Sequence, residues 1–130
     1  MNKNRIGVLA RILLGGTFLV FGLNGFFHFL TMPAMPNAAI SFMMALGQTG
    51  YFFPVLKITE VVSGILLLTG MYVPLALVLL APIIVQITLF HVFLAPDGLL
   101  MAIAIVILEI VLAMIYKEAW KGVLSHKTKL

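Results

Sequence analysis

Four apolar runs dominate this chain, and each is long enough to cross the ~30 Å hydrocarbon core of a membrane as a helix. They cover residues 6–30, 52–69, 74–95 and 99–116. Hydrophobic residues make up 63% of the chain and charged residues only 9%. In a soluble domain, about a quarter of the residues are charged. Because the connections leave no room for a separate soluble domain, we predict a single all-α integral membrane domain over residues 1–130.

Short connections fix the arrangement of the last three spans. Gly70 closes the second span and Pro74 opens the third, while an Ala-Pro-Asp-Gly turn at residues 95–98 leads into the fourth. Connections this short make consecutive helices antiparallel neighbours. The sequence therefore predicts an antiparallel four-helix bundle.

The connection between the first two spans is longer and contains a further apolar segment. Pro33 and Pro36 interrupt the chain, and the segment 37–47 that follows is apolar. We predict a short extracytoplasmic helix at residues 37–47 that lies at the membrane interface. The alternative is a segment that only packs over the end of the bundle.

Basic residues gather near the two ends of the chain. They are Lys3, Arg5, Arg11, Lys117, Lys121, Lys127 and Lys129. The connections 31–50 and 96–98 contain no Lys or Arg, so the positive-inside rule predicts that both termini are cytoplasmic. The net charge of +4 then reflects topology and contact with the lipid surface, and we expect no nucleic-acid partner.

Two ions three residues apart, Lys57 and Glu60, interrupt the second span. An ion at the centre of a membrane helix costs about 2.5 to 3.5 kcal/mol, whereas each Leu, Ile or Val returns about 0.3 to 0.6 kcal/mol. The two ions therefore nearly cancel the hydrophobic drive of their own helix and need partners within the fold. Either they form an internal ion pair that fixes helix packing, or they belong to a ligand or proton site.

Polar side chains from three spans fall at a similar depth near the outer boundary of the bilayer. At about 1.5 Å of rise per residue they lie ~6 to 13 Å from that boundary. They are Asn24, Lys57, Glu60, Gln86 and His91, which could meet in one cavity open to the outside. His28 lies near the outer opening of that cavity. Because helical spacing puts Gln86 and His91 on nearly opposite sides of the third span, both cannot face the bundle centre. We predict a polar site here, in which Lys57 and Glu60 act on protons and the amides and histidines bind a ligand.

Glu109 in the fourth span is the third candidate for proton chemistry. It lies ~16 Å from the outer edge, and Arg11 lies ~27 Å from it. An ion pair between them would need the full reach of both side chains. Otherwise Arg11 extends toward the inner surface, and Glu109 is a protonated acid that needs only hydrogen-bond partners.

The residue types also bear on metals and cofactors. The chain contains no cysteine, so it has no disulfide, thiolate metal site or thiol relay of its own. His28 and His91 lie at similar depth, as two axial haem ligands would, but two histidines without a further haem motif do not support a haem. We expect no metal site.

Two glycine-rich segments carry a family resemblance. They are Arg11-Ile-Leu-Leu-Gly15 leading into Phe21-Gly22-Leu23-Asn24, and Glu60-Val-Val-Ser-Gly64-Ile-Leu-Leu-Leu-Thr-Gly70. Together with the length and spacing of the spans, this pattern resembles the DoxX family of small bacterial four-helix membrane proteins. The resemblance implies a bacterial inner-membrane protein beside respiratory or thiol redox systems. It also implies that Arg11, Glu60 and the glycines at 15, 22, 64 and 70 belong to a shared scaffold and its polar centre.

The first functional hypothesis is a redox-associated membrane subunit that binds a quinone headgroup next to a partner redox protein. Lys57 or Asn24 would donate a hydrogen bond to a quinone carbonyl. Glu60, aided by Gln86 or His91, would handle the proton.

Two further hypotheses stay open. One is a small proton-coupled carrier, in which Glu60 and Glu109 are protonation sites at two depths and a homodimer widens the pathway. The other is a non-catalytic scaffold that docks a partner protein through residues 32–48.

Overall fold

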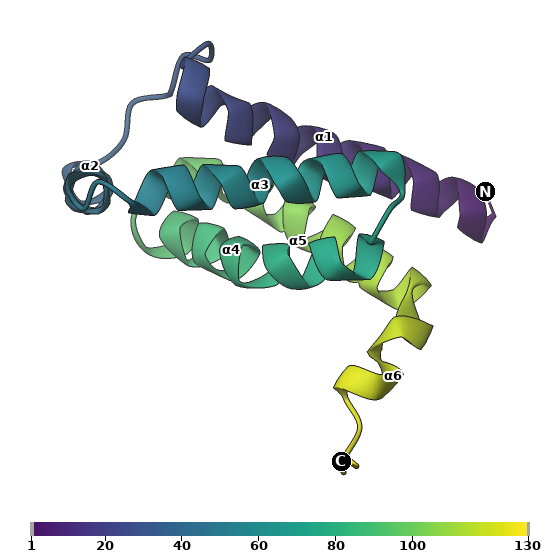
Figure 1. Cartoon of the computed structure of the whole chain (residues 1–130). Coiled ribbons are helices and arrows are strands. Elements are labelled where there is room, and N and C mark those ends of the chain that lie inside the picture. The colour runs from purple at the N-terminus through teal and green to yellow at the C-terminus, as the bar shows by residue number, and fades with distance from the viewer. Residues whose placement is uncertain (1, 130) are drawn as a thin grey trace.

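The computed structural model describes residues 2–129, and within them the regular structure is entirely helical (Figure 1). Four of the helices in this range are long and apolar enough to cross a membrane. They are α1 (Lys3–Phe27), α3 (Phe52–Thr69), α4 (Val73–Phe93) and α5 (Leu99–Ile115), the last preceded by a short turn, η1 (Pro96–Gly98). The prediction of an all-α membrane protein with four spans is confirmed.

The helix ends agree with the predicted spans to within one turn, and the largest differences lie at the two ends of α1. This helix begins at Lys3 because the side chain of Asn2 accepts a hydrogen bond from the Arg5 amide at 2.9 Å. It ends at Phe27 because His28 adopts the left-handed conformation, with φ of 51°. The predicted run to residue 30 therefore overshoots the helix.

The predicted short helix at residues 37–47 is present as α2 (Asn37–Gln48). Figure 1 shows it lying across the end of the bundle opposite both termini, roughly perpendicular to the long helices. Of its residues only Ala39 is buried, and the ring of Phe42 lies 5.9 Å from that of Phe90 in α4. It therefore rests on the bundle without joining the core.

Glycines bring α1 and α3 into close contact. A Cβ atom added to Gly15 would lie 2.9 Å from the Gly64 carbonyl oxygen, and one added to Gly64 would lie 2.8 Å from the Leu19 nitrogen. About two turns further along α1, a Cβ on Gly22 would lie 2.8 Å from a methyl group of Val61. Small residues at a helix crossing let backbones approach this closely in a membrane.

The core between the long helices is small and rich in leucine. Its fully buried side chains include Leu14, Leu67, Leu77, Leu80 and Leu112, which come from all four spans. Most other apolar side chains point outward, as expected for helices solvated by lipid.

Threonine hydroxyls on the spans are satisfied within their own helices. Each donates a hydrogen bond of 2.7 to 2.9 Å to the carbonyl four residues earlier. They are Thr17, Thr59, Thr69 and Thr88. These four residues therefore present little unsatisfied polarity to lipid.

Beyond α5 the chain turns away from the bundle through η2 (Lys117–Ala119) and α6 (Trp120–Val123) (Figure 1). The indole nitrogen of Trp120 donates a hydrogen bond to the Ala113 carbonyl at 2.8 Å. This contact folds the start of the tail back against α5.

Candidate functional site

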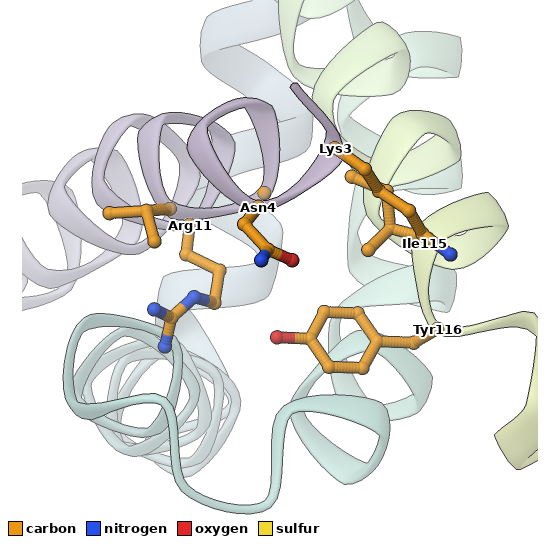
Figure 2. A pocket seen from close by; sticks show the side chains of 7 residues that line it. Lys3, Asn4, Arg11, Ile115 and Tyr116 are labelled. Carbon is orange, nitrogen blue, oxygen red and sulfur yellow. The ribbon is translucent and has the colours of Figure 1, made fainter. Parts of the chain in front are cut away.

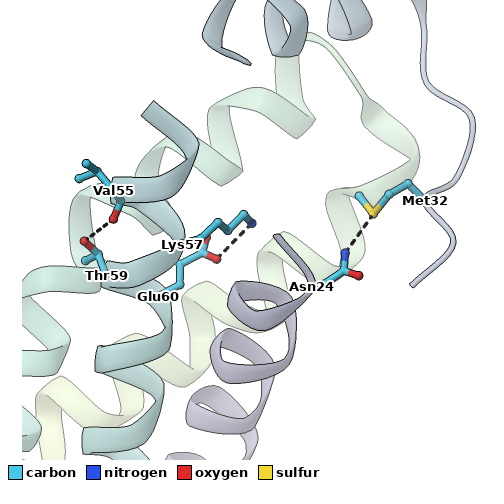
Figure 3. Close-up of polar contacts among 6 residues, drawn as sticks. All are labelled: Asn24, Met32, Val55, Lys57, Thr59 and Glu60. Carbon is cyan, nitrogen blue, oxygen red and sulfur yellow. Dashed lines mark hydrogen bonds and ion pairs between the residues drawn. The ribbon is translucent and has the colours of Figure 1, made fainter. Parts of the chain in front are cut away.

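Lys57 and Glu60 form an ion pair within α3 (Figure 3). The Lys57 Nζ lies 3.2 Å from the Glu60 Oε2, and the two side chains are 22% and 5% exposed. The pair faces α1: a Cβ on Gly25 would overlap the aliphatic part of Lys57, and a Cβ on Gly22 would lie 3.2 Å from the Glu60 Cβ. The geometry thus favours the first of the two alternatives, an internal pair within a helix contact.

Asn24 is buried, but it serves the end of its own helix. Its Oδ1 accepts a hydrogen bond from the Leu30 amide at 2.7 Å, and its Nδ2 lies 4.0 Å from the Met32 sulfur (Figure 3). The side chain thereby fixes the loop that follows α1. His28, which begins this loop, is exposed.

Gln86 and His91 point in different directions, in agreement with their helical spacing. Gln86 is exposed on the outside of α4. The Nδ1 of His91 lies 3.0 Å from the Ala95 carbonyl oxygen, and its ring occupies the space that a Cβ on Gly98 would need. His91 therefore braces the turn between α4 and α5.

The side chains of the predicted outer cluster contact different parts of the fold. The ion pair faces α1, Asn24 faces the loop after α1, and His91 faces the turn before α5. Among the described residues no three His, Asp or Glu side chains lie close enough together to hold a metal ion.

Glu109 lies apart from that pair, at a groove between α4 and α5. The groove has a volume of about 280 Å³. Its lining comprises Leu77, Val78, Ala81, Glu109, Ile110, Ala113 and Trp120. The Oε2 of Glu109 is buried and has no hydrogen-bond partner within residues 2–129. A buried polar atom without a partner is uncommon in folded proteins and calls for an explanation.

Arg11 does not pair with Glu109. The ion pairs within residues 2–129 join Lys57 to Glu60 and Lys121 to Glu118. Instead, Arg11 donates a hydrogen bond of 3.5 Å to the Leu67 carbonyl in the last turn of α3. A cation at this position interacts favourably with the negative end of the helix dipole.

Gly70 makes room for this cap. It follows α3 with φ of 74°, a conformation that glycine adopts readily, and an added Cβ would collide with the guanidinium of Arg11. The Met71 amide also bonds to the Leu66 carbonyl at 3.1 Å, which completes the helix end.

The DoxX family model matches residues 7–93 of the 130-residue chain. The chain belongs to the DoxX family. No curated protein and no solved structure matches it. The matched region of this DoxX protein runs from α1 to the end of α4, so α5 and Glu109 lie outside it.

The six residues that the resemblance assigned to a shared scaffold meet at one interface of this DoxX protein. Arg11 lies against Gly70, Gly15 against Gly64, and Gly22 against Glu60. They unite α1 and α3 and therefore have a structural explanation that needs no ligand.

Trp120 lines the groove together with Glu109. Its return toward α5 depends on the turn at η2. Glu109 was a candidate from the sequence by its charge and its depth in the span.

Proposed function

We propose that this DoxX-family protein is a quinone-proximal, redox-associated membrane subunit, and that the groove at Glu109 holds the quinone headgroup. The observation that carries the proposal is the buried, unpartnered Oε2 of Glu109, which lies beneath a groove whose exposed surface is apolar. Ligand sites are mostly apolar with a few placed polar groups that fix orientation. A quinone headgroup has matching chemistry, since its ring is apolar and its carbonyl oxygens accept hydrogen bonds.

The groove is accessible from the lipid side. Val78 and Ile110, which line it, are 50% and 52% exposed on the outer surface of the bundle. At about 280 Å³ it lies just below the range of about 300 to 1,000 Å³ that encloses a drug-sized ligand. It would therefore hold a headgroup ring while the isoprenoid tail stays among the lipid chains.

Glu109 would act as a neutral acid that donates a hydrogen bond to a quinone carbonyl and supplies a proton when the quinone is reduced. Because the chain contains no cysteine, we assign the supply of electrons to a partner redox protein. The basic residues near both ends of the chain support an orientation with both termini cytoplasmic, and the family resemblance supports a place in the bacterial inner membrane.

The test is the quinone content of protein purified in mild detergent, measured by extraction and mass spectrometry. We expect Glu109→Leu to lose the quinone, Glu109→Gln to keep part of it because the amide still donates, and Glu60→Gln to keep it. If Glu60→Gln loses the quinone while Glu109→Leu keeps it, the site lies at the ion pair. A wild-type protein that neither carries nor takes up quinone would refute the function.

A second candidate function is a scaffold that docks a partner through residues 32–48. What favours it is the exposure of apolar side chains along this segment: Met32 is 57% exposed and Met44 59%. Met44→Ser should then weaken complex formation while Ser41→Ala, on the same helix, leaves it intact. Equal behaviour of the two variants would count against this candidate.

The proton-coupled carrier remains a third prediction. It requires flux that depends on a pH gradient in proteoliposomes, with loss of flux in both Glu60→Gln and Glu109→Gln. Glu60 faces α1 and Glu109 lies at the groove between α4 and α5, so the two acids line different helix contacts.

A further inference from the structure

A second cavity, of about 230 Å³, lies where α1 begins and α5 ends (Figure 2). The first two turns of α1 contribute Lys3, Asn4 and Gly7 to its lining, and Arg11 follows one turn later. The end of α5 contributes Ile115, and Tyr116 follows it. The cavity is therefore built by two helices that are far apart in the sequence.

Polar groups converge on this cavity. Figure 2 shows the Asn4 amide and the Tyr116 hydroxyl directed toward the same space, with the Arg11 guanidinium to one side against the end of α3 and the Lys3 ammonium to the other side beside Ile115. Arg11 uses one donor for the Leu67 carbonyl, at 3.5 Å. A guanidinium has five N–H donors, so further donors of Arg11 are available to a ligand.

The two basic residues of this cavity form no ion pair with an acidic side chain among residues 2–129, although Arg11 lies at the negative end of the α3 dipole. Neither ion pair within residues 2–129 includes Lys3 or Arg11, and the first turn of α1 contains no acidic residue. The amino end of the 25-residue helix α1 adds further positive potential. The cavity therefore favours an anion.

We propose that this cavity binds a phosphate group, and that the group belongs to the headgroup of an anionic phospholipid. Guanidinium and ammonium groups together with neutral donors are the usual phosphate-binding set. Basic pockets between spans at a membrane surface bind anionic headgroups.

The surroundings favour a lipid as the source of the phosphate. Val8, which also lines the cavity, and Ile12, one turn further along α1, are 45% and 50% exposed and offer an apolar surface for acyl chains. Tyr116 and Trp120 follow the last span, where interfacial aromatics mark the headgroup level.

The test is binding of phosphatidylglycerol to the full chain in detergent micelles, followed by native mass spectrometry and thermal unfolding. Phosphatidylcholine and inorganic phosphate are the comparison ligands. We expect one phosphatidylglycerol molecule to bind more tightly than phosphatidylcholine and to raise the melting temperature. Arg11→Gln should weaken phosphatidylglycerol binding about fivefold, the effect of one basic residue at a lipid surface.

Arg11→Gln also removes the contact with Leu67, so a second variant keeps the test independent of folding. The double variant Asn4→Ala with Tyr116→Phe leaves that contact and the net charge unchanged, and it should show a similar loss of affinity. Lys127→Gln removes one positive charge from the exposed tail, outside the cavity, and should bind as the wild type does.

Three outcomes would overturn the proposal. One is equal binding of phosphatidylglycerol and phosphatidylcholine by the wild type. Another is an equal loss in Lys127→Gln and in the double variant, which would show attraction by net charge alone. Displacement of the lipid by millimolar inorganic phosphate would overturn the lipid as the source and leave free phosphate as the ligand.

Discussion

Gly15 and Gly64 face each other across the contact of α1 and α3, each within reach of the other's carbonyl oxygen. A Cβ on Gly15 would lie 2.9 Å from the Gly64 oxygen, and a Cβ on Gly64 would lie 2.7 Å from the Gly15 oxygen. Because the obstacle on both sides is backbone, neither helix can accommodate a side chain by a rotamer change. The two helices must separate instead.

This contact makes Gly15→Ala destabilising. Over-packing a tight contact costs about 1 to 3 kcal/mol, and we expect a loss of that size in the free energy of unfolding in detergent. The neighbouring residue supplies the control, since a Cβ on Gly16 would meet nothing within 4 Å. Gly16→Ala should be neutral or slightly stabilising because alanine is the better helix former. Equal effects of the two substitutions would contradict the packing described here.

Because Lys57 and Glu60 form a buried ion pair, substitutions of these two residues should have non-additive effects on the free energy of unfolding. Lys57→Met leaves the Glu60 carboxylate buried without its partner, and removal of one member of a buried pair costs about 3 to 5 kcal/mol. The double variant Lys57→Met with Glu60→Leu should recover most of that loss, because no charge remains buried. Thermal unfolding of the three variants in one detergent measures this coupling.

The chain provides a matched exposed pair with the same spacing. Lys121 and Glu118 lie 2.6 Å apart, with side chains 76% and 69% exposed. Glu118→Gln should change the melting temperature little, since exposed pairs contribute about 0 to 1 kcal/mol. A loss as large as that of Lys57→Met would show that burial is not what makes the Lys57 pair important.

Asn24 should stabilise the loop at the end of α1 and should not bind a cofactor. Asn24→Ala removes the acceptor of the Leu30 amide, and the net contribution of such a hydrogen bond is about 0.5 to 1.5 kcal/mol. Asn24→Asp retains an acceptor oxygen and should preserve more of the stability. Melting temperature and quinone content measured together separate the two roles. Loss of quinone from a fully stable Asn24→Ala protein would restore Asn24 as a ligand residue.

The groove at Glu109 contains the only tryptophan of the chain, Trp120. A quinone bound there should quench its fluorescence in a saturable manner, because quinones quench indoles at short range. Glu109→Leu should abolish saturation, leaving only the linear quenching caused by collisions in the micelle. A saturable quench that persists in Glu109→Leu would place the quinone elsewhere near Trp120.

The spans were predictable because hydropathy decides them almost alone. The exact ends of the spans were harder to predict, because the end of α1 depends on the side chain of Asn24 and the conformation of His28. The turn chemistry at Gly70 and the short helix α2 were readable from glycine and proline positions.

The assembly of the site was harder to predict. Counting residues gives each polar group a depth and a helix face, but not the neighbour that this face meets. Lys57 and Glu60 share a face that meets α1, whereas Glu109 meets α4. The glycines themselves carried the missing information, because Gly22 and Gly25 mark where α1 leaves space for that pair.

The place of Gly25 beside Lys57 has a consequence for biogenesis. Since α1 is synthesised before α3, the surface that receives the lysine stem is in the membrane before the costly helix arrives. The hydroxyls of Thr59 and Thr69 are already satisfied within α3, which leaves the ion pair and the unpartnered Ser63 hydroxyl as the polar groups that oppose insertion of this helix. The first span thus serves as an intramolecular insertion partner for the helix that is least able to enter lipid alone.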